Sequence, residues 1–96
     1  MDKKYILTET TKEWNGVTLH QIKAVRDIPE HGVKAGDLGG WIEKEENLDH
    51  DGNAWVSDNA LVYGNAWVCD NARVYGNALV YGDARVYDSA WVSGNA

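Results

Sequence analysis

From residue 54 onward, small apolar and polar positions repeat every six residues. Written from Ala54, the chain reads AWVSDN, ALVYGN, AWVCDN, ARVYGN, ALVYGD, ARVYDS and AWVSGN. Every unit begins with Ala and has Val third, and it closes with Gly or Asp followed by Asn, Asp or Ser. Alternation with a period of two indicates a strand, and Gly/Asp-Asn pairs indicate a tight turn. Each six-residue unit, here called a hexad, therefore predicts one short strand and one corner.

Strands this short, with a corner after each, favour a triangular coil of three hexads, with successive coils stacked at ordinary strand spacing. Residues eighteen positions apart then share a column, and the chain shows regular columns at that spacing. Two columns place a guanidinium on an indole ring, which is a favourable cation–π arrangement. The columns are Trp55, Arg73 and Trp91; Trp67 and Arg85; Leu61 and Leu79; Tyr63 and Tyr81; and a corner ladder of Asn59, Asn77 and Asn95.

The invariant Ala and Val of the hexads are predicted to point inward. The positions between them hold Trp, Leu, Arg, Tyr, Ser and Cys. Arg73 and Arg85 occupy those positions, and burying an unpaired guanidinium would be costly. The aromatic side chains are therefore expected on the outside, with their polar atoms in reach of water.

The first half of the chain has a different pattern. Residues 5–8 and 17–28 read as strands, and Asn15-Gly16 between them is a strong hairpin signal. A turn at 29–32 and a glycine-rich stretch at 33–42 follow, and 43–47 is an acidic bend. Residues 48–53 read as an imperfect hexad, with Leu48 in the Ala place and His50 in the Val place. We therefore expect residues 1–47 to form a β-hairpin cap on the first coil, and 48–96 to form the repeat as one folding unit, since solenoid ends need caps.

The Val-x-Gly-Asn-Ala-x pattern of residues 48–96 resembles the hexapeptide repeat of left-handed parallel β-helix proteins. Many of those proteins are bacterial acyltransferases that use acyl-CoA or acyl-carrier protein. The stretches 22–25 and 35–42 resemble the opening of bacterial and prophage-encoded hexapeptide-repeat proteins, some of which are named as acyltransferases. The resemblance implies an all-β, left-handed parallel β-helix. For an enzyme of this kind, it also implies a histidine general base near a cleft between subunits.

Composition and charge narrow the class of partner and the compartment. The net charge is −6, with 15 acidic and 9 basic residues, and nucleic-acid-binding faces are basic. No apolar run is long enough to span a membrane, and the start lacks the apolar stretch of a signal peptide. A single cysteine, Cys69, cannot form an internal disulfide. We therefore expect a cytoplasmic protein that binds neither nucleic acid nor membrane.

Three histidines are the candidates for a general base. His20 lies in a strand and His31 in a turn, and both are expected at the surface. His50, beside Asp49 and Asp51, is the catalytic candidate, but a hydrogen-bonded buried histidine is the favoured interpretation. No other catalytic residue is predicted.

Other residue groups do not predict a cofactor or a metal ion. The spacing of Gly36, Gly39 and Gly40 fits no phosphate-binding loop and favours turn and cap geometry. The acidic residues of 43–51 lack the spacing of a calcium loop. Cys69 has no neighbour in the sequence that would activate a thiol, so no redox or nucleophilic role is predicted for it.

The outward aromatic, leucine and arginine side chains are the candidate binding surface, because Trp, Tyr and Arg are enriched at interfaces. The repeat reaches residue 96 without a charged or irregular cap. Self-association is predicted through the last coil or through the face of Leu61, Tyr63, Leu79 and Tyr81. The candidate interface residues are Trp55, Leu61, Tyr63, Trp67, Arg73, Tyr75, Leu79, Tyr81, Arg85, Tyr87 and Trp91.

Three functions remain open from the sequence. The leading hypothesis is a non-enzymatic, self-assembling β-helix scaffold or interaction protein, with a phage or mobile-element role. The second is an acyltransferase-like enzyme with a site between subunits and His50 as its base. The third is a module that binds a nucleotide or a sugar by stacking it on outward Trp and Tyr side chains.

Overall fold

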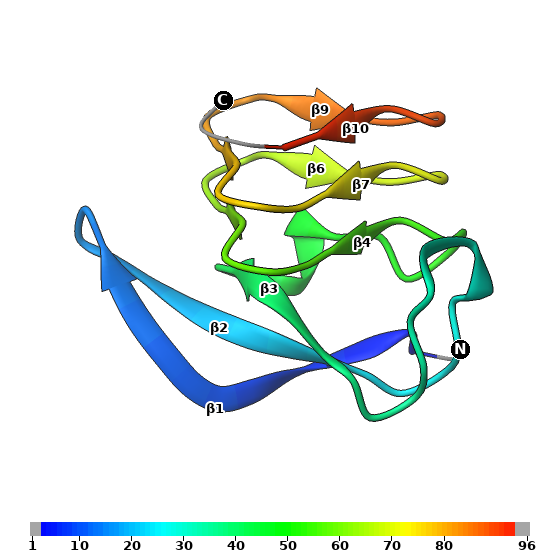
Figure 1. The fold of residues 1–96 in the computed structure, drawn as a ribbon. Helices are drawn as coiled ribbons and strands as arrows, with labels where there is room; N and C mark the ends of the chain where they lie inside the picture. The colour runs from blue at the N-terminus through cyan, green and yellow to red at the C-terminus, as the bar shows by residue number, and fades with distance from the viewer. Residues whose placement is uncertain (1–2, 94–96) are drawn as a thin grey trace.

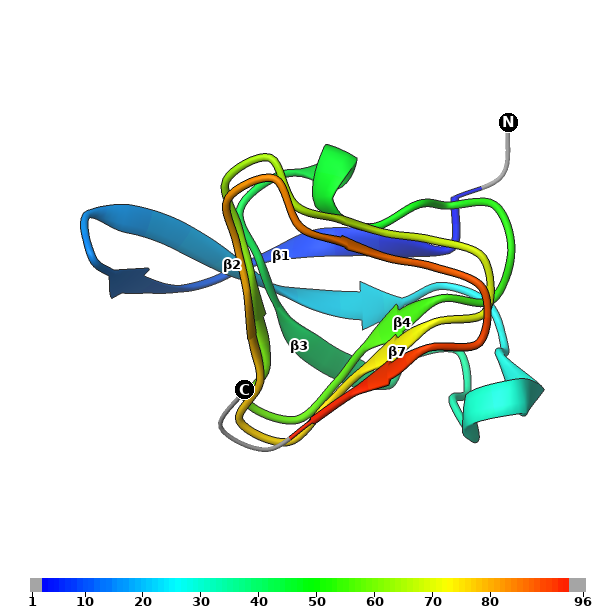
Figure 2. The ribbon, with the colours of Figure 1, turned by 90° about the horizontal axis from the view of Figure 1, so that it is seen from above.

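A computed structural model describes residues 3–93 and shows an all-β chain with two short 3₁₀ helices. A stack of small coils rests on a long twisted hairpin, which projects sideways from beneath the stack (Figure 1). Seen from above, the coils superimpose in a triangular outline (Figure 2).

The repeat forms seven strands of two residues each, one per hexad. Strands eighteen residues apart pair in parallel, giving the orders β4-β7-β10, β5-β8 and β6-β9. The prediction of a parallel β-helix with three hexads per coil is thus confirmed. The strands are β4 (Trp55–Val56), β5 (Leu61–Val62), β6 (Trp67–Val68), β7 (Arg73–Val74), β8 (Leu79–Val80), β9 (Arg85–Val86) and β10 (Trp91–Val92).

The interior of the coils is built from the invariant small residues, as predicted. Val56, Val62, Val68 and Val74 are fully buried, and the first residues of the five hexads from 54 to 83 are buried as well. The first and third residues of each hexad, Ala and Val, point inward, and these small side chains fill the narrow core of the coils without aromatic rings.

The corners are closed by the fifth residue of each hexad. This residue has positive φ in six successive hexads, and it is Gly or Asp in each. Asp58 and Asp70 add a second contribution, because each accepts a hydrogen bond from a backbone N–H of the coil above, at Gly76 and Asp88, both at 3.1 Å. At other corners, the side-chain amide of Asn53 donates to that of Asn71, and the amide of Asn65 donates to the carboxylate of Asp83. Of the expected ladder of Asn59, Asn77 and Asn95, the last residue lies outside the described residues.

The N-terminal part contains the predicted hairpin. β1 (Tyr5–Trp14) and β2 (Val17–Ala24) are antiparallel, and Asn15 and Gly16 both have positive φ in the turn between them. The turn at 29–32 contains η1 (Pro29–His31). β3 (Leu38–Ile42) pairs antiparallel with β2 and parallel with β5, so the hairpin and one face of the coils form a single sheet, β1-β2-β3-β5-β8.

Strand stacking begins with β3, ahead of residue 48. Trp41 pairs with Leu61 and Ile42 with Val62, so Gly40, Trp41 and Ile42 stand under the Ala, outward and Val places of a hexad. The chain then passes through η2 (Glu45–Asn47) and enters the coil.

The expected alignment of residues 48–53 is wrong. Leu48 bridges to Val68 and takes the Val place, not the Ala place. The N–H of Asp49 bonds to Val68 and that of Asn53 to Asp70, as Cys69 and Asn71 bond to the coil above them. The segment from Asp49 to Asn53 is therefore two residues longer than its counterpart, and His50 lies in this insertion instead of pointing inward.

Candidate functional site

The face formed by β6 and β9 carries two exposed aromatic side chains, Trp67 and Tyr87, and one cationic side chain, Arg85. Trp67 and Arg85 are in register on adjacent strands, and Cζ of Arg85 lies 5.5 Å from the centre of the Trp67 ring. Trp67 is 38% exposed and Tyr87 is 54% exposed. The cation–π pair predicted from the column of residues is confirmed.

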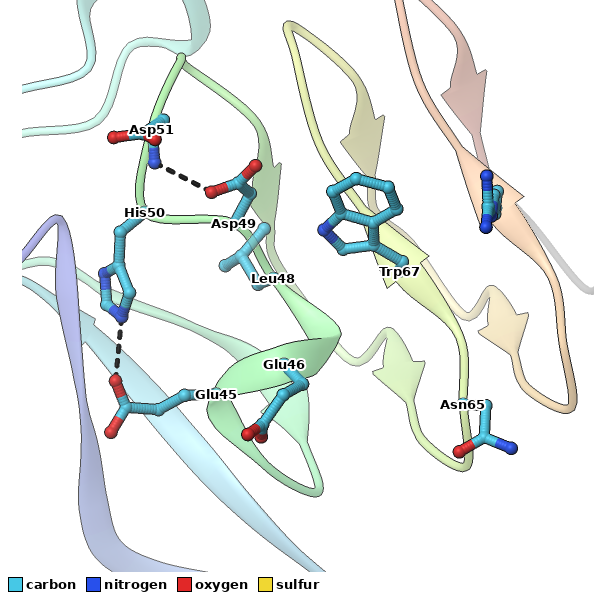
Figure 3. A pocket seen from close by; sticks show the side chains of 9 residues that line it. Glu45, Glu46, Leu48, Asp49, His50, Asp51, Asn65 and Trp67 are labelled. Carbon is cyan, nitrogen blue, oxygen red and sulfur yellow. Dashed lines mark hydrogen bonds and ion pairs between the residues drawn. The ribbon is translucent and has the colours of Figure 1, made fainter.

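A groove runs between this face and the turn formed by η2 and the insertion at residues 49–52 (Figure 3). It consists of two open hollows of about 490 Å³ and 390 Å³ that share Asp49, Trp67 and Arg85. We call it the Trp67 groove, and its lining residues are Glu45, Glu46, Leu48, Asp49, His50, Asp51, Asn65, Trp67, Cys69, Asp70, Arg85 and Tyr87.

His50 stands at the edge of this groove with both ring nitrogens engaged. Nδ1 accepts a hydrogen bond from the backbone N–H of Lys4 at 3.1 Å, so it carries no proton there. Nε2 then holds the proton and donates it to Oε1 of Glu45 at 2.8 Å, the contact drawn in Figure 3. This hydrogen bond from His50 lowers the pKa of Glu45. A general base needs a free nitrogen in reach of substrate, and His50 offers none in this arrangement.

The His50 ring also fixes the N-terminal strand against the coil. It stacks on the Tyr5 ring at a centroid distance of 4.2 Å. The Tyr5 hydroxyl lies 2.9 Å from the carbonyl of Glu45 and 2.5 Å from that of Leu48, so it donates to the carbonyls of the η2 turn. Burial raises the pKa of Tyr5 well above its usual range. His50 is thus hydrogen-bonded, as in the favoured interpretation, but it is only partly buried, and it joins the cap to the insertion instead of lying inside the coil.

Lys4 is a buried cation that sequence reasoning missed. Its side chain is fully buried, and Nζ donates to the backbone carbonyl of Ala54 at 2.6 Å, at the lower end of the coils. Burial, together with the nearby charge of Arg26, lowers the pKa of Lys4 from 10.5 to about 8. No period in the sequence marks Lys4, because a contact across fifty residues leaves no local signal.

The pKa of Lys4 predicts how stability depends on pH. Between about pH 8 and 10.5 the unfolded chain binds more protons at Lys4 than the folded chain, so folding becomes more favourable as pH rises. We expect the free energy of unfolding of the wild type, relative to Lys4→Met, to rise by about 2 kcal/mol from pH 8 to pH 10. Taking this difference removes the opposite contributions of Tyr5 and Cys69, whose pKa values burial raises. Urea unfolding followed by circular dichroism measures it, and parallel curves for the two chains would contradict the prediction.

Two of the expected interface residues are not at the surface. Trp55 is only 1% exposed and Leu61 only 4%, so neither can contribute to an open binding face. Tyr5 packs edge-on against Trp55, and a Cβ atom at Gly39 would lie 2.8 Å from its ring. The N-terminal part therefore covers Trp55.

The predicted face of Leu61, Tyr63, Leu79 and Tyr81 is partly covered as well. Lys12 and Trp14 of the hairpin line a hollow of about 310 Å³ together with Leu61 and Leu79. Tyr63 and Tyr81 stack at 5.4 Å, as the columns predicted, and Tyr81 remains exposed. A flat partner could not lie against this whole face without meeting the hairpin.

The third face keeps its aromatic and cationic side chains together. Cζ of Arg73 lies 4.9 Å from the Tyr75 ring and 5.7 Å from the Trp91 ring. The two rings meet edge to face at 5.9 Å, and Trp91 is 60% exposed. The predicted placement of the Arg73 guanidinium over Trp91 is confirmed, whereas Arg73 and Trp55 are in register on adjacent strands without a cation–π contact among the described residues.

The remaining candidates have structural surroundings. His20 is half-buried, with Nδ1 at 3.2 Å from the carbonyl of Thr8. His31 is not a free surface residue, because both ring nitrogens are buried, and burial and the charge of Arg73 lower its pKa. Cys69 is buried. Gly36 has a positive φ in a turn, whereas Gly39 and Gly40 pack within β3.

Residues 3–93 contain no group of three or more His, Cys, Asp and Glu side chains placed to hold a metal ion. The same part of the chain has no helix of the length and apolar character needed to cross a membrane.

Comparison with known proteins agrees with the repeat architecture. Residues 54–70, 66–81 and 80–94 match the family model described as "YdcK Beta solenoid repeat". The chain is 36% identical over 70 residues to the protein of Escherichia coli (strain K12) named "Uncharacterized acetyltransferase YdcK", an alignment that covers 64% of this chain and 21% of that protein. The chain thus spans about a fifth of the length of this relative. The resemblance to hexapeptide-repeat proteins is confirmed, and the repeats are those of a β-solenoid related to a protein named as an acetyltransferase.

Proposed function

We propose that the chain is a non-enzymatic β-helix scaffold that self-associates through the open edge formed by β8, β9 and β10. One observation carries the proposal. Ala84 and Ala90 are exposed and Val92 is half-buried, whereas the equivalent Ala66, Ala72 and Val74 one coil below are buried. Within the described residues, β8, β9 and β10 each pair on one side only. Such an edge offers both apolar core and unpaired backbone groups to another strand.

The opposite end of the stack is already covered, which constrains the assembly. β3 lies under β5, Leu48 lies under β6, and Lys4 bonds to the carbonyl of Ala54. Stacking one copy's open edge on another copy's covered end is therefore disfavoured. Two open edges can meet about a twofold axis, which closes the assembly as a dimer instead of a fibre.

Acyl transfer is the competing hypothesis, and it is supported by the name of the E. coli relative. Two observations favour the scaffold. His50 has both ring nitrogens engaged, and the Trp67 groove is an open surface that does not exclude water. A cytoplasmic location belongs to the same proposal, and the single buried thiol, Cys69, is compatible with a reducing compartment.

The test introduces a charge into the open edge without disturbing the monomer. Ala90→Glu places a carboxylate at an exposed position that a second copy would bury, and a twofold dimer would carry two such carboxylates in one interface. We expect the wild type to sediment as a dimer at micromolar concentration, and Ala90→Glu to weaken the dimer by about tenfold or more. Ala35→Glu, an equivalent change in an exposed loop, is the matched control. A wild type that is strictly monomeric, or a variant that dimerises equally well, would refute the proposal.

A further inference from the structure

We propose that the Trp67 groove is a docking surface for a lysine- or arginine-containing segment of a partner protein. The groove lies on the β6/β9 face and not on the open edge, so this proposal does not depend on self-association. Three features lead to it: the charge of the groove, its exposed rings, and its extended open shape.

The charge of the groove is complementary to a cationic segment. Five carboxylates line it, and Arg85 is the one Lys or Arg among its lining residues. Glu45 is engaged by His50 and Lys3, and Asp70 by the N–H of Asp88. Within residues 3–93, the carboxylates of Glu46 and Asp51 have no hydrogen-bond partner, and that of Asp49 accepts one backbone N–H, from Asp51. Opposite charge on a partner would pair with these oxygens and steer its approach.

The exposed rings suit the same partner. Trp67 lines both hollows, and Tyr87 lies along the second. Cations already lie over rings elsewhere in this chain, with Nζ of Lys12 4.3 Å from the centre of the Trp41 ring. A guanidinium or ammonium group at Trp67 or Tyr87 would gain the same attraction, with carboxylates beside it.

The shape of the groove favours an extended peptide over a small molecule. Small-molecule sites enclose most of their ligand, whereas this groove is open along its length and its two hollows adjoin at three shared residues. In Figure 3, Glu46 and Asp49 come from the η2 turn and the insertion, and Trp67 and Asn65 come from the coil. A segment lying between them would contact both sides. The net charge of −6 disfavours a nucleic acid as the occupant.

The experiment titrates the full chain into a fluorescently labelled peptide in which Arg alternates with Gly, and measures anisotropy. We expect saturable binding that weakens with added salt, and no binding to the same peptide with Glu in place of Arg. Trp67→Ala is expected to weaken binding about tenfold and Asp49→Asn about threefold. Trp91→Ala is the matched control, because Trp91 also pairs with an arginine but lies outside the groove, and it should leave binding unchanged.

Arg85 supplies a variant that should gain affinity. Arg85→Gln removes the repelling charge and frees the Trp67 ring, so binding should tighten severalfold, an effect that loss of folding cannot produce. Ala90→Glu should bind as the wild type does, which separates this proposal from self-association. Equal weakening by Trp67→Ala and Trp91→Ala would overturn the proposal. The proposal would also be overturned if the peptide did not bind at all. It would be overturned as well if spermidine, at matched charge, displaced the peptide equally well, since that indicates unspecific attraction of polycations.

Discussion

Replacing Trp55 by Ala is expected to lower the free energy of unfolding by about 3–5 kcal/mol, whereas Trp91→Ala should cost less than about 1 kcal/mol. The two residues occupy the same place of the hexad and the same column, with Arg73 between them. Trp55 is buried against Tyr5 and Gly39, but Trp91 is mostly exposed. Removing the Trp55 ring would leave a cavity where the cap meets the first coil. Urea unfolding followed by far-ultraviolet circular dichroism measures both values.

Comparing the two variants separates the contribution of the N-terminal cap to stability from the contribution of the Trp55, Arg73 and Trp91 column. If the columns of outward side chains alone stabilised the coils, the two substitutions would cost similar amounts, since each removes a ring that is in register with Arg73. Equal losses would therefore contradict the covering of Trp55 by the N-terminal part. A large loss at Trp55 alone would show that packing of the cap on this ring contributes strongly to stability.

The repeat was predictable because its information is local. Each hexad carries its own strand alternation and corner residue, and the period of six determines which residues stack eighteen positions later. The same reasoning predicted the Arg85–Trp67 contact and the Tyr63–Tyr81 stack. The burial of Trp55 could not be predicted from the repeat, because Trp55 and Trp91 lie in identical Ala-Trp-Val-Ser sequences and only contacts with distant residues distinguish them.

The sequence placed His50 wrongly in the Val place because residues 48–53 match the spacing of a hexad by coincidence. Gly52-Asn53 matches the corner of a hexad, which suggested that the four residues before it were the strand. The strand position is in fact taken by Leu48, and the insertion lies between Leu48 and the corner. A clearer signal was present at residues 40–42, where Gly, Trp and Ile fill the Ala, outward and Val places. The carboxylates of the Trp67 groove were recognised as an acidic bend, but their position opposite Trp67 depends on the path of the insertion.

Gly39→Ala is the second substitution with a large expected effect. A Cβ atom at this position would lie 2.6 Å from the carbonyl oxygen of Val56, 2.7 Å from Cγ1 of Ile22 and 2.8 Å from Cζ2 of Trp55. These separations are shorter than atoms tolerate, and one of the neighbours is backbone that cannot rotate away. We expect β3 to be forced from the coil, at a cost of about 3 kcal/mol in the free energy of unfolding.

A matched control distinguishes this crowding from the general effect of losing a glycine. Gly82 has φ of +65° at a corner and open space around its Cβ position. Gly82→Asn should therefore change stability by less than about 1 kcal/mol, because Asn tolerates a left-handed backbone. If Gly39→Ala were as mild as Gly82→Asn in urea unfolding, β3 could not pack so closely on β4. If it is severe, Gly39 is required because the cap approaches the coil at backbone distance, which is the contact that also buries Trp55.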